Sequence, residues 1–91
     1  MPQHRRFSYV ARTRAFREAL RAAPEDVVRA VAEVTVRFRD GRAQGLSVLP
    51  YWGDPKLGNA YTMALPGCDA FILYKEYLDQ AILEFIQLVW L

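Results

Sequence analysis

The sequence of 91 residues contains one cysteine, Cys68, and one histidine, His4. A single cysteine cannot form an internal disulfide, which is typical of proteins from the reducing cytoplasm. Cys68 also has no second thiol, and its only histidine is distant in the chain, so the usual donors of a metal site or an activated thiol are missing. We expect no metal, no cofactor and an incidental role for Cys68.

Long hydrophobic runs are missing as well. No apolar run approaches the ~20 residues that cross a bilayer, although 53% of the residues are hydrophobic. The basic N-terminus lacks the apolar core and the small-residue cleavage site of a signal peptide. We therefore expect no membrane contact and a cytoplasmic location. Because the apolar share exceeds the average for soluble domains, we also expect a partner or a second copy to cover part of the surface.

Catalytic signatures are absent too. The glycines form no phosphate-binding loop, a lone histidine cannot make a paired-histidine metal motif, and neither Ser8 nor Ser47 has a suitably placed histidine. Residue chemistry alone therefore indicates a small α+β domain without a recognisable active site.

Charge is distributed unevenly. Residues 1–45 hold all ten arginines and five acids (10 − 5 = +5), and residues 46–91 hold two lysines and five acids (2 − 5 = −3), which together give the net +2. Such asymmetry marks a surface for phosphate or for an acidic partner. The alternative is that the arginines cover the solvent face of two helices.

Hydrophobic periodicity predicts strands and helices along the whole chain. Thr13 suits a helix N-cap, Pro24 suits a helix start, and Gly41 suits a C-terminal turn. The predicted order is a strand at 6–11, helices at 13–23 and 24–41, a short extended piece at 46–49, and strands at 60–65, 70–77 and 81–90. Residues 1–91 thus form one α+β domain, β-α-α-β-β-β, in which an antiparallel helical hairpin packs on a mostly antiparallel sheet.

The apolar stripe of the helical hairpin is expected to pack on the sheet through Phe16, Leu20, Val27, Val31, Val34 and Phe38. The last two strands are apolar on both faces, which places them in the centre of the sheet. Helices would cover one face. A partner, or the loop that carries Tyr51 and Trp52, would cover the other.

This order of elements resembles the RelE/ParE superfamily, the toxins of type II toxin–antitoxin modules. The stretch "FREALRAAPEDVVRAV" is similar to the helix–break–helix of the family, and "FILYKEYLDQAILEFIQLVW" is similar to its closing hairpin. The resemblance extends from about Phe7 to Leu91. It implies a growth-inhibiting, plasmid-stabilisation type of toxin, wrapped by a cognate antitoxin segment that is disordered before binding.

The sequence departs from the mRNA-cleaving members of the family. In those members, basic residues on the sheet stabilise the charge that develops on the attacked phosphate. Here Phe71 stands where an arginine is usual, residues 62–64 carry no arginine, and Trp90 and Leu91 replace a histidine, tyrosine or basic pair. These departures favour a toxin that binds a protein target, as the branch that blocks DNA gyrase does, or a degenerate copy.

The remaining cations are candidate contacts to RNA or to a target: Arg37, Arg39, Arg42, Lys56 and Lys75. Arginines at a helix C-terminus also stabilise the helix dipole, and Lys75 also suits a solvated strand face. Candidate contacts to a protein partner are Tyr51, Trp52, Phe71 and Trp90. Tyr61 and Tyr74 are expected in the core, with an RNA contact as the alternative.

Three functions stay open. The first is a toxin that is neutralised by an antitoxin and acts by binding a protein. The second is a ribosome-dependent endoribonuclease that cuts mRNA with the five cations in a rearranged site. The third is a non-toxic homodimeric interaction module. A neighbouring short reading frame with a DNA-binding N-terminal half would favour the first two.

Overall fold

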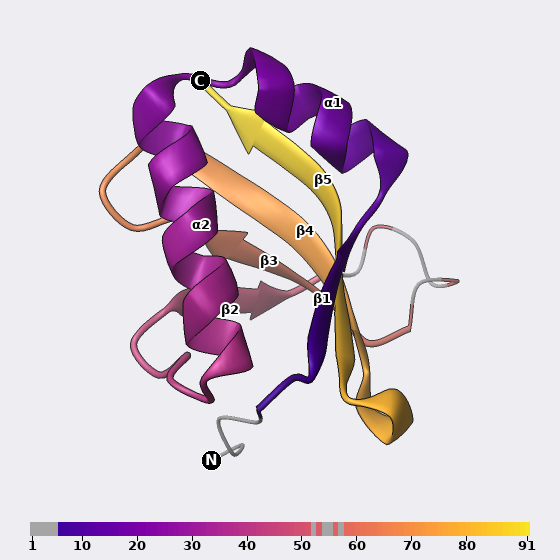
Figure 1. Ribbon diagram of the computed structural model, residues 1–91. Coiled ribbons are helices and arrows are strands. Elements are labelled where there is room, and N and C mark those ends of the chain that lie inside the picture. The colour runs from indigo at the N-terminus through magenta and orange to yellow at the C-terminus, as the bar shows by residue number, and fades with distance from the viewer. Residues whose placement is uncertain (1–5, 52, 54–55, 57) are drawn as a thin grey trace.

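The computed structural model describes residues 6–51, 53, 56 and 58–91 (Figure 1). Its elements are β1 (Tyr9–Arg12), α1 (Arg14–Ala22), α2 (Glu25–Arg39), β2 (Ser47–Pro50), β3 (Ala60–Ala64), β4 (Ala70–Tyr77), the 3-10 turn η2 (Leu78–Gln80) and β5 (Ile82–Trp90). The predicted α+β class is confirmed. The extended piece expected at 46–49 is a full strand, β2, so four strands follow the helices where three were predicted.

The five strands form one sheet in the order β1-β5-β4-β3-β2. β1 runs parallel to β5, and the other three neighbouring pairs are antiparallel. β4 and β5 are interior strands, as expected from their two apolar faces. Both helices lie on the same side of the sheet (Figure 1). We call that side the helix face and the opposite side the outer face.

The helix face contains the hydrophobic core. Side chains alternate along a strand, and the register places Tyr74 and Phe85 side by side on this face. The ring of Phe38 lies 5.4 Å from that of Tyr74, and the ring of Phe16 lies 5.2 Å from that of Phe85. Five of the six residues predicted for the hairpin face are buried: Phe16, Val27, Val31, Val34 and Phe38. Leu20 is partly buried and packs against the same core.

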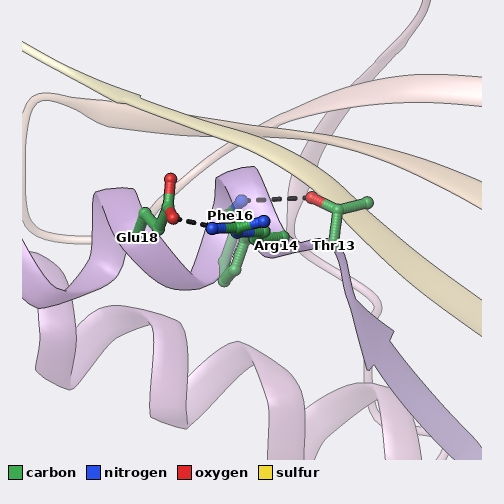
Figure 2. A network of polar contacts seen from close by, with 4 residues as sticks. All are labelled: Thr13, Arg14, Phe16 and Glu18. Atoms are coloured by element: carbon green, nitrogen blue, oxygen red, sulfur yellow. Dashed lines mark hydrogen bonds and ion pairs between the residues drawn. The ribbon is translucent and has the colours of Figure 1, made fainter.

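The N-terminus of α1 is tied to the sheet through Thr13. The Thr13 hydroxyl accepts a hydrogen bond from the amide of Phe16 (3.1 Å), which confirms the predicted N-cap (Figure 2). The same hydroxyl donates to the carbonyl of Ile86 (2.7 Å). Ile86 is the extra residue of a bulge in β5, because Leu73 pairs with Gln87 and Tyr74 pairs with Phe85. One side chain therefore caps a helix and fixes it to an irregular point of the central sheet.

The predicted glycine terminates α2, two residues after the last helical residue, Arg39. Gly41 adopts a φ of 70°, a left-handed conformation that favours glycine. The amide of Gly41 donates to the carbonyl of Phe38 (3.3 Å), and the amide of Arg42 donates to the carbonyl of Arg37 (2.8 Å). This pair of bonds is a Schellman motif, which satisfies carbonyls at the helix end.

Candidate functional site

The outer face of the sheet is mostly apolar and lies away from both helices. The strand register places on it residues from all five strands: Tyr9, Leu49, Thr62, Phe71, Leu73, Lys75, Tyr77, Ile82, Glu84, Gln87 and Val89. Tyr9, Leu49 and Phe71 are 60%, 67% and 42% exposed. Tyr9 and Leu49 lie on the two edge strands and Phe71 lies on an interior strand, so exposed apolar groups are spread across the outer face.

Part of the outer face is covered. Leu73 and Ala60 are buried although neither belongs to the core on the helix face. The half-buried Tyr51 extends the β2 ladder, since its amide donates to the carbonyl of Ala60 (2.9 Å). A Cβ at Gly53 would meet the phenol end of Tyr51, so a larger residue there would require that side chain to shift. Trp52, which we expected to cover or extend this surface, lies outside the described residues.

Three polar side chains meet on the outer face, at the end of the β4–β5 hairpin. The Nζ atom of Lys75 lies 5.1 Å from the ring centre of Tyr77, and the Tyr77 hydroxyl donates to Oε1 of Glu84 (3.0 Å). Lys75 and Glu84 are directly opposite in the register. The hydrogen bond to Glu84 raises the pKa of Tyr77, and burial adds to the effect. We call Lys75, Tyr77 and Glu84 the outer-face cluster.

The outer-face cluster has groups for proton transfer but few for charge stabilisation. Glu84 can accept a proton and Tyr77 can donate one. Lys75 is the only cation that the described strands place on this face. Negative charge that developed beside Lys75 would also meet the carboxylate of Glu84. The cluster therefore lacks the set of fixed cations that stabilises an attacked phosphate.

The sequence predicted Lys75 as a candidate but did not single out Tyr77 or Glu84 as its partners. The signal was present in the alternation of "YKEY", which puts residues 75 and 77 on one face. The short turn at 78–80 then brings β5 back so that Glu84 faces Lys75.

The predicted arginines do not join this cluster, because α2 lies on the helix face. The guanidinium of Arg37 donates to the carbonyls of Arg42 (2.9 Å) and Gln44 (2.6 Å), which holds the turn after α2. Arg42 pairs with Asp40 at 3.1 Å. Arg39 is exposed at the same helix end, and Lys56 is exposed in the loop between β2 and β3. Arg37, Arg39 and Arg42 thus gather at the C-terminal end of α2, apart from Lys75 on the outer face.

Comparisons with known proteins place this geometry in a structural class. No family model and no curated protein matches the sequence. A chain of the RelB–RelE antitoxin–toxin complex from Methanococcus jannaschii matches with a TM-score of 0.71 and 11% identity over 88% of both chains. A chain of the RelE–RelB complex from Pyrococcus horikoshii OT3 matches with a TM-score of 0.67 and 16% identity, over 96% of this chain and 94% of that one.

The chain has a RelE-like fold. A third structure, the RelBE2 toxin–antitoxin complex from Mycobacterium tuberculosis, covers 100% of both chains with a TM-score of 0.68 and 14% identity. The RelE-like fold therefore accounts for the whole chain, including β1 and β5. At identities of 11–16% the match shows the fold alone, so the side chains must carry any argument about function.

The aromatic candidates of this RelE-like chain divide between the two faces of its sheet. Phe71 lies on the outer face opposite Val89 and is 42% exposed. Trp90 lies half-buried on the helix face and packs against the core. Tyr74 is buried, its ring stacks on Tyr61 at 5.6 Å, and burial raises its pKa. Among these four aromatic residues, Phe71 is therefore the one whose side chain is available to a partner.

Cys68 is a free cysteine between β3 and β4. It follows β3 and is half-buried, and burial raises the pKa of its thiol, with the nearby carboxylates of Asp26 and Asp69 adding to the effect. A raised pKa keeps the sulfur protonated and weakly nucleophilic. No helix in the described part of the chain is both long and apolar enough to span a membrane.

Proposed function

We propose that this chain is the toxin component of a toxin–antitoxin pair, acting in the cytoplasm and held inactive by a cognate antitoxin protein. The observation that carries the proposal is the RelE-like fold over the whole chain. The three structural neighbours come from antitoxin–toxin complexes. The exposed outer-face residues Tyr9, Leu49 and Phe71 give such a partner an apolar surface to cover.

We further propose that the toxin inhibits growth by binding its target and not by cutting it. Lys75 is the only cation that the described strands place on the outer face, and Glu84 lies opposite it, whereas fixed cations around an attacked phosphate stabilise the charge that develops there. The structural neighbours are RelE complexes, which lend no support to DNA gyrase as the target. The proposal therefore names the mode of action and leaves the target open.

A second function, ribosome-dependent cleavage of mRNA, is favoured by one observation, the outer-face cluster. In that function Glu84 would take the proton of the attacking 2′-hydroxyl, Lys75 would contact the phosphate, and Tyr77 would supply a proton to the leaving oxygen. The hydrogen bond from Tyr77 to Glu84 (3.0 Å) brings the acid and the base together.

The first experiment is expression of the chain in a host, alone and together with the adjacent short reading frame. We expect growth arrest with the chain alone and relief when the neighbour is present. A folded chain that leaves growth unchanged would support the interaction module, and sedimentation equilibrium would then show whether it is a homodimer.

The second experiment separates binding from cleavage. We expect Lys75→Ala and Glu84→Gln to retain growth arrest, and purified translating ribosomes to keep their mRNA intact. Cuts in the ribosomal A site that disappear in both variants would establish the endoribonuclease instead. Leu49→Ala, an exposed outer-face change outside the cluster, is the control for general effects on this surface.

A further inference from the structure

An open groove of about 610 Å³ lies on the other side of the molecule, between the C-terminal end of α2 and the residues before β1. It is lined by Arg6, Phe7, Ser8, Val36, Arg39 and Asp40. Backbone hydrogen bonds hold the segment before β1, which forms one wall of the groove. The amide of Phe7 donates to the carbonyl of Phe38 (3.2 Å), and the amide of Ser8 donates to the carbonyl of Ala81 (2.8 Å). The groove therefore lies between the last turn of α2 and a segment before β1 that is held by backbone hydrogen bonds.

The groove holds arginines that the fold itself does not use. Six described arginines contact a carboxylate, a carbonyl or a ring: Arg12, Arg14, Arg17, Arg29, Arg37 and Arg42. Within the described part of the chain, Arg6, Arg21 and Arg39 have no hydrogen bond, ion pair or ring contact. Two of these three, Arg6 and Arg39, line the same groove. Free guanidinium groups at one place are suited to binding a carboxylate or a phosphate.

The rest of the groove favours a peptide over RNA. Val36 is 50% exposed in it, and Val28, two turns earlier on the same side of α2, is 40% exposed. Phe7 is only 3% exposed and offers no ring on which a base could stack. Asp40 and the negative end of the α2 dipole oppose any anion, and they oppose a chain of phosphates more than a single carboxylate. A ligand with one or two carboxylates beside apolar side chains meets all of these conditions.

We propose that this groove binds an acidic, apolar peptide segment of the antitoxin, with a carboxylate between Arg6 and Arg39 and an apolar side chain against Val36. The partner identity rests on the proposed function, whereas the peptide chemistry rests on the groove. Tyr9 follows Phe7 by two residues and is exposed on the outer face. A segment that leaves the groove along β1 therefore reaches the outer face within a few residues.

The test is an NMR titration of the full chain with the peptide acetyl-Leu-Glu-Leu-Glu-amide. We expect the backbone amides of Ser8, Val36 and Arg39 to shift, and the glutamine peptide acetyl-Leu-Gln-Leu-Gln-amide to cause much smaller shifts. The double variant Arg6→Gln, Arg39→Gln should weaken binding about tenfold or more, because two charge-assisted bonds are lost. Arg21→Gln, which removes an unpaired exposed arginine outside the groove, should leave binding unchanged.

Several results would overturn this inference: equal binding of both peptides, no shift at the groove, or equal weakening by Arg21→Gln. Oligouridylate that shifts the same amides more strongly than the acidic peptide would make the groove an RNA site. An unchanged circular dichroism spectrum shows that the double variant is folded. The growth assay tests the proposed function separately. Growth arrest without peptide binding would contradict this inference alone. Peptide binding without growth arrest would contradict the proposed toxin function alone.

Discussion

The two faces of the sheet are formed by the same strands but differ in how much of their surface is buried. On the helix face, Phe16, Val34 and Phe85 are fully buried and the aromatic rings contact one another. On the outer face, Leu73 is buried while Tyr9 and Phe71 are open to solvent. Alternation along β4 and β5 thus separates residues that hold the fold from residues available to a partner. Stability and recognition can therefore be changed independently.

The largest effect is expected for Val31→Asp on the helix face. Val31 is 1% exposed, so a carboxylate there would be buried without a partner. We expect a loss of about 4 kcal/mol or more, enough to unfold a small domain. Urea unfolding followed by circular dichroism measures it. Val28→Asp is the matched control, because Val28 lies on the exposed side of the same helix. If Val31→Asp lowered the unfolding free energy by less than about 0.5 kcal/mol, the helix register would be contradicted.

A middle effect is expected for Thr13→Ala, which removes the link between α1 and β5. The hydroxyl both caps the helix and donates to Ile86, so its loss should cost about 1–2 kcal/mol of unfolding free energy. Thr13→Ser keeps the oxygen and should cost less than half as much. Equal losses in the two variants would show that the methyl group, and not the hydroxyl, matters.

On the outer face, Phe71→Ala should change function more than stability. Phe71 is 42% exposed, so the loss of unfolding free energy should stay near 1 kcal/mol or below. We expect growth arrest, or its relief by the antitoxin, to weaken with Phe71→Ala and to persist with Lys75→Ala. Arrest that disappears only with Lys75→Ala would favour the endoribonuclease.

The smallest effect is expected at the turn between the two central strands. Ala81 has a φ of 54°, a left-handed conformation that costs a non-glycine residue about 1 kcal/mol. Ala81→Gly should relieve this strain, but glycine also loses more backbone entropy on folding. The two effects partly cancel, so we expect the unfolding free energy to rise by less than about 1 kcal/mol. Thermal unfolding measures the change, and a clear loss of stability would show that the Ala81 methyl group packs favourably.

Features set by neighbouring residues could be predicted from the sequence. The cap at Thr13, the start of α2 after Pro24 and its end at Gly41 each depend on chemistry within one helical turn. Periodicity predicted the apolar strands, and the resemblance to the RelE/ParE superfamily implied the RelE-like fold; both are confirmed.

Features set by distant residues were not predicted. The parallel pairing of β1 with β5 and the bulge at Ile86 depend on segments far apart in the chain. Lys75 was predicted as a candidate, but the position of Glu84 opposite it depends on the register of β4 and β5. The hydrogen bonds from Arg37 to the carbonyls after α2 could not be predicted either, because an arginine at a helix end has several available partners.

The pairing of β1 with β5 also sets the order in which the molecule can assemble. Ser8 and Ala81 are 73 residues apart, and the register continues from Tyr9 and Ile82 towards Phe85. Contacts this distant in sequence slow folding, because the entropy of closing a long loop is lost before they form. A chain under synthesis cannot complete its sheet before β5 is made, so the contact of Phe16 with Phe85 forms only then. Under the proposed function, an antitoxin that is already present would meet the chain before its outer face is complete.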